Sequence, residues 1–361
     1  MKRKLWIPAF LAVGLALAML IPCFVRAGEA VSGSGYKVLP AIKHGNLTVF
    51  PVVAAKSHDT QGFLTLDEGL RSGEVVVTES GIARPMIRRR HPIPISPGGA
   101  QVNQLVLINN SQRPLLLLAG EIVTGGKQDR VIGKDRIVPP ESDPVDLSVF
   151  CVEPGRWTGA SMNFKSLDAA MAQPTVRAKA MGAKNQQQVW DEVGKSKDAM
   201  AMIVPAPAAE PVRSTTSYAR VMANDEVKKQ VDSVAEPIQH NYQSLIRQLR
   251  DQNAVGVVVA VNGQIVWADL FASTNLLEKY WPKLVRSYAA EAVVTRAKGG
   301  EADLRSAQEF IEHMEGRHET VDSEPGLYRH TEIAGDGFRA FELTSLLPKT
   351  GFDLHVAKMA E

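Results

Sequence analysis

Glycines, cations and carboxylates alternate in one short stretch of the chain, Ala119 to Asp135, which reads AGEIVTGGKQDRVIGKD. Glycines let a backbone approach a ligand closely, and lysine and arginine side chains supply the positive charge that a phosphate or a carboxylate needs. The sequence therefore predicts a loop that binds an anionic small ligand. The candidate ligand-binding residues of this motif are Gly120, Glu121, Gly125, Gly126, Lys127, Gln128, Arg130 and, further along the chain, Arg156.

The motif resembles a P-loop only in the spacing of Gly120 and Gly125. Gly126 stands where the P-loop lysine should be, and Gln128 follows Lys127 in place of a magnesium-binding serine or threonine. A phosphate-binding loop of that type is therefore excluded. The alternative to a ligand site is a glycine-rich turn with solvated charges.

A second group of reactive residue types follows at Cys151. The candidate catalytic residues are Cys151, Glu121 and Glu153, because a thiol beside the cation of Arg156 can serve as a nucleophile. The competing interpretation places Cys151 in the core, since it continues the valine-rich face of a strand of period two over Val145–Cys151. Glu153 and Arg156 then form an ion pair that closes the turn after this strand, with Trp157 as its apolar lid.

Several other kinds of site lack sequence support. His313 and His318 are not spaced to share a helical face, and neither HExxH nor CxxC occurs, so we predict no metal site and no cofactor. No GxSxG sequence marks a serine hydrolase. The net charge of +2 gives no global field for nucleic acid, and we expect the local basic patch at residues 88–91 to be a solvated strand end or loop.

The N-terminus has the three parts of an export signal. Lys2, Arg3 and Lys4 precede an apolar run over residues 5–25, and small residues surround Ala27. We predict a signal peptide over residues 1–27 and an exported protein, periplasmic or extracellular. The alternative is an uncleaved anchor in the inner membrane formed by residues 5–25, the only membrane contact that we expect. Cleavage after Ala27 would leave Cys151 as the only cysteine.

The remaining pattern predicts an α+β fold. Short apolar runs broken by glycine, proline and asparagine predict a β-rich part over residues 36–200, which carries the motif and includes a helix over 185–200. Residues 201–216 are rich in proline and alanine and read as a linker or loop. Residues 217–361 read as an α+β part in which Asn262 and Gly263 form a hairpin turn. We also predict hairpins around residues 109–111 and 335–337, and a capping box at Thr65 and Glu68.

Two stretches of the chain are recognisable. The run LLLAGEIVTGGKQDRVIGKDRIVPP, followed by DLSVFCVEPGRW, resembles the ARG and Rhodanese-Phosphatase-superfamily-associated protein domain, a bacterial family. VNGQIVWADLF with KYWPKLVRSYAAEA is similar to the C-terminal half of the same family. The resemblance implies association with ADP-ribosylglycohydrolases and rhodanese-type phosphatases, and hence ADP-ribose or nucleotide-derived ligands. It implies no catalytic role for any residue.

Three functions follow as expectations. The first is an exported domain that binds a nucleotide-, ADP-ribose- or phosphate-like anion through the Gly120 to Arg130 loop. The second is a hydrolase of a nucleotide-like substrate that uses Cys151 or the acids of the motif. The third is a structural or interaction module of the cell envelope, with protein partners that the sequence does not specify.

Overall fold

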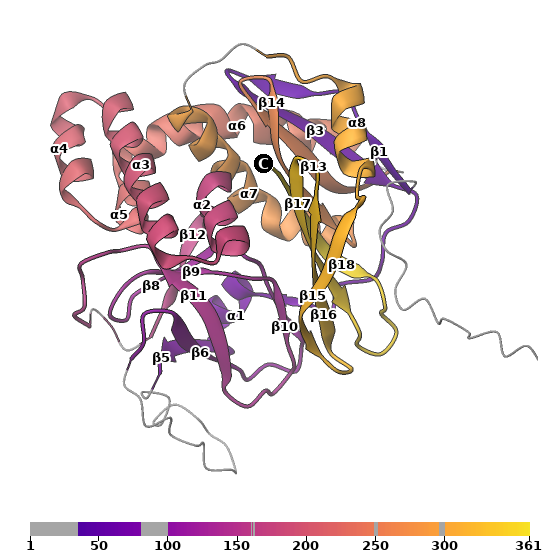
Figure 1. Cartoon of the computed structure of the whole chain (residues 1–361), viewed down its shortest axis with the longest axis horizontal. Helices are drawn as coiled ribbons and strands as arrows, with labels where there is room; N and C mark the ends of the chain where they lie inside the picture. The colour runs from indigo at the N-terminus through magenta and orange to yellow at the C-terminus, as the bar shows by residue number, and fades with distance from the viewer. Residues whose placement is uncertain (1–34, 81–99, 160, 162, 249–251, 296–299) are drawn as a thin grey trace, which may run out of the picture.

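The computed structural model describes residues 35–80, 100–159, 161, 163–248, 252–295 and 300–361. Within this part of the chain the fold is α+β, as predicted, with three β-sheets and eight α-helices (Figure 1). The predicted signal peptide or anchor and the basic patch at residues 88–91 lie outside the described residues. No helix in the described ranges is long and apolar enough to cross a membrane.

The largest sheet has nine strands and joins the two ends of the chain. Its order is β1-β3-β13-β14-β18-β17-β16-β15, with β2 paired to β3, and every pairing is antiparallel. The strands are β1 (Tyr36–Val38), β2 (Ile42–His44), β3 (Leu47–Ala54), β13 (Asn253–Val261), β14 (Gln264–Phe271), β15 (Gly316–Glu324), β16 (Tyr328–Gly335), β17 (Phe338–Ser345) and β18 (Asp353–Ala360). Since β3 pairs with β13, residues from both predicted parts of the chain build this one sheet.

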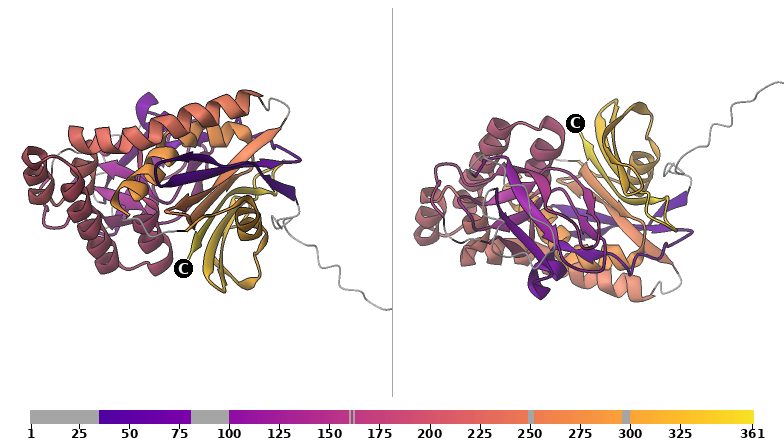
Figure 2. Two further views of the ribbon diagram at one scale, coloured as in Figure 1. Left: turned by 90° about the horizontal axis from the view of Figure 1, so that it is seen from above. Right: turned by 90° about the horizontal axis from the view of Figure 1, so that it is seen from below.

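Helices cover both faces of the nine-stranded sheet, as Figure 2 shows from two sides. The long helices α6 (Asp225–Gln248) and α7 (Thr274–Val294) pack together, and both contact β3 on one face. The short helix α8 (Leu304–Glu312) covers part of the other face through Ala307 and Ile311. The central strand β13 is therefore apolar on both sides, which explains its unbroken apolar run from Ala254 to Val261.

The second sheet has six strands in the order β12-β8-β9-β11-β6-β5 and curls until its edges meet. A bridge joins Thr78 of β5 to Asn163, and the Phe164 amide donates to the Val77 carbonyl at 2.9 Å, just before β12 begins. We call it the curled sheet. Its strands are β5 (Val75–Glu79), β6 (Gln104–Asn109), β8 (Glu121–Thr124), β9 (Arg130–Ile132), β11 (Val145–Cys151) and β12 (Lys165–Met171).

A small third sheet packs beside the curled sheet. It consists of β4 (Leu64–Thr65), β7 (Leu115–Leu117) and β10 (Arg136–Val138), and helix α1 (Leu66–Ser72) follows β4 directly. The predicted capping box is confirmed: the Thr65 hydroxyl accepts from the Glu68 amide, and the Glu68 carboxylate accepts from the Thr65 amide. Apolar side chains of the two sheets form a common core.

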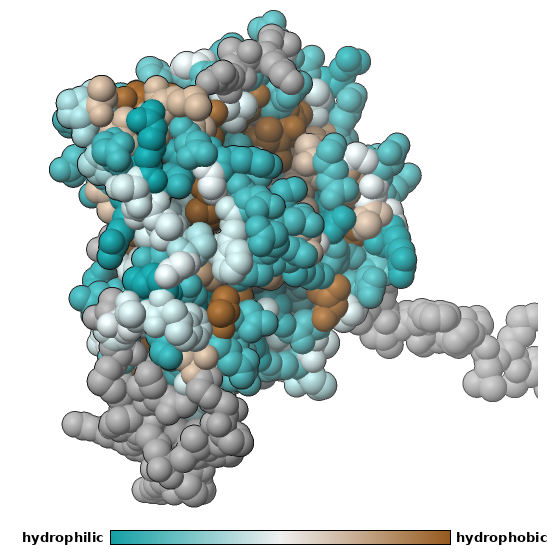
Figure 3. Space-filling model, turned by 60° about the vertical axis from the view of Figure 1, so that its left-hand side comes forward, coloured by the Kyte–Doolittle hydropathy of each residue, from teal (hydrophilic) through white to brown (hydrophobic). Residues whose placement is uncertain are grey.

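The remaining helices lie between the two larger sheets and along one side of the molecule (Figure 1). They are α2 (Pro174–Ala178), the π-helical turn η2 (Lys179–Ala183), α3 (Gln186–Ile203), α4 (Ala206–Ser214) and α5 (Tyr218–Ala223). The Asn185 side chain caps α3, which confirms the helix predicted there. The side that carries α3, α4 and α5 has a mostly hydrophilic surface with small separate hydrophobic areas (Figure 3).

Residues 201–216 differ from the predicted linker or loop, because they contain the end of α3 and the whole of α4. Ala209 and Val212 are buried against the main core. Proline is tolerated in the first turn of a helix, where its missing N–H would have no partner, and Pro207 lies there. The high proline and alanine content of this segment therefore does not prevent it from forming a helix.

The hairpin predictions had mixed outcomes. Asn262 and Gly263 connect β13 to β14 with φ values of 52° and 73°, as a type I′ turn requires, so this prediction is confirmed. The turn at residues 335–337 also connects paired strands, β16 and β17. The hairpin around residues 109–111 was wrong, because β6 pairs with β5 and β11 whereas β7 pairs with β4 and β10. The side-chain amide of Asn109 donates hydrogen bonds to the Arg113 and Pro139 carbonyls. These bonds stabilise the segment in which the chain passes from the curled sheet to the small third sheet.

Prolines inside two predicted helical regions do not divide them. An interior proline often kinks or ends a helix, because it removes a backbone hydrogen bond. The structure nevertheless has one helix through Pro237, α6, and one through Pro282, α7. Both helices bury long apolar stripes, and this packing outweighs the one hydrogen bond that each proline removes.

Buried ions hold the curled sheet against the nine-stranded sheet. The carboxylate of Asp269 on β14 accepts two hydrogen bonds of 2.9 Å from Arg177 on α2 and one of 3.0 Å from His355 on β18. The other nitrogen of His355 lies 2.5 Å from Asp135, whose second oxygen accepts from the Ala119 amide. All four side chains are fully buried, so their charges are paired within the protein.

Candidate functional site

The predicted motif forms an antiparallel hairpin of the curled sheet. Strand β8 and strand β9 are paired, and residues 125–129 make the turn between them. Gly125 and Gly126 have φ values of 125° and 49°. A Cβ atom on Gly126 would lie 2.2 Å from the Phe164 ring and 2.6 Å from a Glu79 oxygen, so only glycine fits this turn.

The structure separates the first two motif residues from the others. Gly120 packs against the side chain of Arg177, which a Cβ atom on Gly120 would meet at 2.6 Å. Glu121 is buried and accepts a hydrogen bond of 2.8 Å from Lys283 on α7, which also pairs with Asp67. Both residues lie at the opposite end of β8 from the turn, so they belong to the contact between the curled sheet and α7.

Arg130 points into the curled sheet at the end that carries the motif turn. It shares its strand face with Ile132 of the core and is paired in register with Cys151. Its side chain is 0% exposed, and the nearest carboxylate is that of Glu79, with 4.0 Å between Nη2 and Oε1. Its hydrogen bonds to the Asp129 and Gln101 carbonyls are 3.5 Å long. Burial lowers the pKa of Arg130, but a guanidinium stays protonated in proteins.

Glu79 ends β5 and fixes the motif turn from the other side of the sheet. Its Oε1 accepts a hydrogen bond of 2.6 Å from the backbone amide of Lys127. Its Oε2 has no hydrogen-bond partner among the described residues. Nothing in the sequence marked Glu79, since it lies 48 residues from Lys127 and only the closure of the curled sheet brings it to the motif.

Arg156 holds the motif turn from outside. It donates to the Gly125 and Gly126 carbonyls at 3.3 and 3.0 Å and pairs with Glu153 at 2.6 Å. These contacts confirm the predicted ion pair between Glu153 and Arg156, and the Glu153 side chain raises the pKa of Arg156 further. Asp129 adds a carboxylate 3.5 Å from Arg156, and burial raises the pKa of Asp129.

Helix α5 supports the turn through its N-terminal cap. The Ser217 hydroxyl accepts from the Arg220 amide and donates a hydrogen bond of 2.7 Å to Asp129. Gln128 is also fixed, because its amide group donates to the Glu153 carbonyl at 3.1 Å. The motif therefore has a rigid backbone whose polar contacts come from both sides of the turn.

Trp157 and Lys127 form the outer rim of this site. The Lys127 ammonium lies 4.9 Å from the centre of the Trp157 ring, and the Arg130 guanidinium carbon lies 6.0 Å from the same centre. Trp157 is 42% exposed, an unusual degree for an indole, and Lys127 is half-buried. The indole thus lies beside both of these cations, whereas the apolar lid that we expected over the Glu153 and Arg156 pair stays a prediction.

Several buried polar atoms without partners belong to residues at the motif end of the curled sheet. In native proteins nearly all such atoms are paired, so a cluster of them needs an explanation such as a bound molecule. Within the described residues, the unpartnered atoms here are Thr78 Oγ1, Glu79 Oε2, Ser80 Oγ, Gln128 Oε1, Arg130 Nε, Arg156 Nε and Asn163 Oδ1. The set contains both donors and acceptors.

Cys151 faces the same end of the curled sheet but is not activated. Its thiol is fully buried, and burial raises its pKa, an effect that outweighs the nearby charge of Arg130. The Glu153 amide donates to the sulfur at 3.3 Å, and Gln186 holds the backbone of Cys151. The protonated, enclosed thiol fits the core interpretation of Cys151 and gives no support to a nucleophile.

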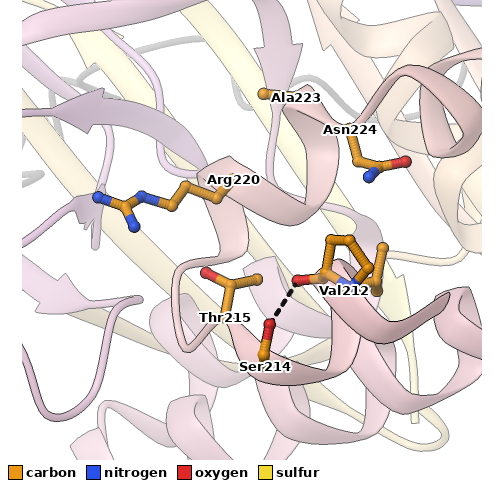
Figure 4. A pocket seen from close by; sticks show the side chains of 7 residues that line it. Val212, Ser214, Thr215, Arg220, Ala223 and Asn224 are labelled. Carbon is orange, nitrogen blue, oxygen red and sulfur yellow. Dashed lines mark hydrogen bonds between the residues drawn. The ribbon is translucent and has the colours of Figure 1, made fainter. Parts of the chain in front are cut away.

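A separate pocket of about 420 Å³ opens between α4 and α5. Its lining residues are Pro211, Val212, Ser214, Thr215, Arg220, Ala223 and Asn224, of which only Arg220 is charged. In Figure 4 the Arg220 side chain extends to one side, away from Val212 and Asn224. None of the predicted site residues lines this pocket. No group of three or more histidine, cysteine, aspartate or glutamate side chains in the described ranges could hold a metal ion.

Comparison with known proteins gives one match. The model of the ARG and Rhodanese-Phosphatase-superfamily-associated Protein domain matches residues 35–357, nearly the whole chain. No curated protein and no solved structure matches the sequence.

Proposed function

The chain belongs to the ARG and Rhodanese-Phosphatase-superfamily-associated Protein domain family, and we propose that this member binds a small anionic ligand at the motif end of the curled sheet. The observation that carries the proposal is the state of Arg130. A fully buried guanidinium normally has close hydrogen-bonded acceptors, because desolvation of an unpaired charge is costly. Arg130 has none closer than 3.5 Å among the described residues.

The rim residues define how the ligand is held. Lys127 places an ammonium group beside an exposed indole, a combination that suits an anionic group attached to a ring. The motif turn presents its rigid backbone next to both. We infer that Lys127 faces the anionic group of the ligand, that Trp157 contacts its ring or apolar part, and that Arg130 supplies donors behind them.

A thermal-shift screen tests the proposal. The panel contains inorganic phosphate, AMP, ADP-ribose and short carboxylates, and each hit is measured again by calorimetry. We expect at least one compound to stabilise the protein, and we expect Arg130→Ala to weaken its binding at least tenfold, as loss of a charged hydrogen bond does. Arg213→Ala, which removes an exposed arginine of α4, is the matched control.

A second variant guards against misfolding of Arg130→Ala. Lys127→Ala removes a half-buried side chain at the rim and should fold normally, which circular dichroism verifies. It should weaken binding of anionic hits with little change in melting temperature. If no compound binds, or if both substitutions leave binding intact, the motif is an architectural corner of an interaction module and the proposal is refuted.

We also propose that the protein is exported through residues 1–27. The support is the order of basic, apolar and small residues that ends at Ala27. Fractionation of cells that express a C-terminally tagged chain should place it outside the cytoplasm, and mass spectrometry should find a mature N-terminus at Gly28. A full-length chain in the inner membrane would indicate the anchor instead.

A further inference from the structure

The charges at the motif end of the curled sheet balance. Three cations face three carboxylates, so with all six groups ionised the net charge is zero. The cations are Lys127, Arg130 and Arg156, and the carboxylates are Glu79, Asp129 and Glu153. The innermost part of the site is therefore not a simple receptor for an anion, since an anion next to Arg130 would also meet Glu79.

The unpartnered atoms around Arg130 point to a dipolar group. Arg130 Nε is a donor, whereas Glu79 Oε2 and Gln128 Oε1 are acceptors, and all three side chains are at least nine-tenths buried. A group that satisfies these atoms must offer an acceptor to Arg130 and an N–H donor to Glu79. A planar amide presents both on adjacent atoms, C=O beside N–H.

We propose that the inner end of the ligand is a planar amide. Its carbonyl accepts a hydrogen bond from Arg130, and its N–H donates a hydrogen bond to Glu79. This rests on the proposed function and sharpens it: the anionic group stays outside near Lys127, and the amide-bearing ring occupies the space behind Trp157. The Trp157 ring centre lies 6.0 Å from the Arg130 guanidinium carbon, and the indole is partly exposed, so we propose that it turns aside when the ligand enters.

The substitution Glu79→Gln replaces a hydrogen-bond acceptor with a donor and keeps the shape of the side chain. In Glu79→Gln, the oxygen stays where Oε1 now accepts the Lys127 amide, because that amide needs an acceptor. The new NH2 group then takes the place of Oε2 and donates into the site. A donor facing the N–H of an amide repels it, whereas a ligand carboxylate accepts hydrogen bonds both from the new NH2 group and from Arg130.

The experiment compares nicotinamide with nicotinate, which differ only in amide against carboxylate, at millimolar concentrations by ligand-observed NMR and calorimetry. The wild-type protein should bind nicotinamide at least tenfold more tightly than nicotinate, which corresponds to one hydrogen bond to a charged group. Glu79→Gln should reverse this preference. Glu74→Gln, at a partly exposed carboxylate, is the matched control and should leave the preference unchanged.

Each outcome decides between the two proposals. Tighter binding of nicotinate to the wild-type protein overturns the amide reading even if Glu79→Gln does not fold. Binding of phosphate or AMP that requires Arg130, without any binding of nicotinamide, refutes the amide reading and leaves the proposed function intact. Absence of binding by every compound of both sets refutes both proposals.

Discussion

The buried cluster of Asp135, His355, Asp269 and Arg177 makes stability depend on pH in a direction that can be calculated. Burial by itself would lower the pKa of His355, but Asp135 and Asp269 outweigh it and raise the pKa to about 9 from its usual value of 6.5. The folded protein therefore keeps a proton on His355 that the unfolded chain loses near pH 6.5. This contribution to stability is complete below pH 6.5 and is lost as the pH rises to 9.

The size of the effect follows from the shift. One pKa unit corresponds to about 1.4 kcal/mol, so the full range from 6.5 to 9 removes about 3 kcal/mol of the free energy of unfolding. Between pH 7 and pH 8 alone the loss is about 1 kcal/mol, since the folded state then binds nearly one more proton at this site. That is a measurable fraction of the stability of an ordinary domain.

Two other buried groups change stability with opposite signs, one below pH 7 and the other above pH 8. Burial and then the charge of Asp353 raise the pKa of Glu342 to about 7, which lowers stability as the pH rises toward 7. Burial lowers the pKa of Lys358 to about 8, so the folded state releases its proton first and gains relative stability above pH 8. A variant at His355 retains both groups and isolates the histidine.

Urea denaturation at half-unit steps from pH 6 to pH 9 provides the assay. The wild-type free energy of unfolding, minus that of His355→Gln, should shrink by about 3 kcal/mol across this range. His318→Gln, on the exposed edge strand β15, should show the wild-type dependence. A difference that is flat with pH, or an imidazole of His355 that titrates near 6.5 by NMR, would show that the buried cluster does not hold the proton.

Three further predictions concern packing and burial. Lys283→Met leaves the Glu121 carboxylate buried without its cation, and it should lower the free energy of unfolding by about 3 kcal/mol or more in chemical denaturation, unlike the exposed Lys195→Met. Gly126→Ala forces a Cβ atom into the Phe164 ring at a positive φ, so it should cost about 1–3 kcal/mol, and a variant as stable as the wild type would contradict the turn geometry. Cys151 should resist a thiol reagent in the native protein and react fully in urea, as mass spectrometry can follow; rapid labelling of the folded chain would place the thiol at the surface.

Features set by neighbouring residues could be predicted from the sequence. The Asn262 and Gly263 turn, the capping box of Thr65 and the alternating strand that ends in Cys151 were all confirmed, because their geometry depends on backbone conformation and side chains a few residues apart. The turn of the motif, with its two glycines, was also predicted as a loop.

The predictions that failed involved competition between local preference and packing. The Asn109 turn looked like a hairpin, yet its strands find better partners in different sheets. The proline-rich segment around α4 looked unsuited to a helix, yet its alanine and valine side chains complete a core. In both cases the free energy of burial at distant sites decided the local structure.

The sequence by itself determined the α+β composition, the family and the residue types of the motif, because these depend on order along the chain alone. Only the tertiary structure decided which charges face each other. Glu79 reaches Lys127 across 48 residues, Lys283 reaches Glu121 across 162, and His355 reaches Asp135 across 220. Coulomb and hydrogen-bond energies depend on distances in space and on desolvation. The environment of Arg130 is therefore set by the closed sheet that surrounds it and cannot be read from its position in the sequence.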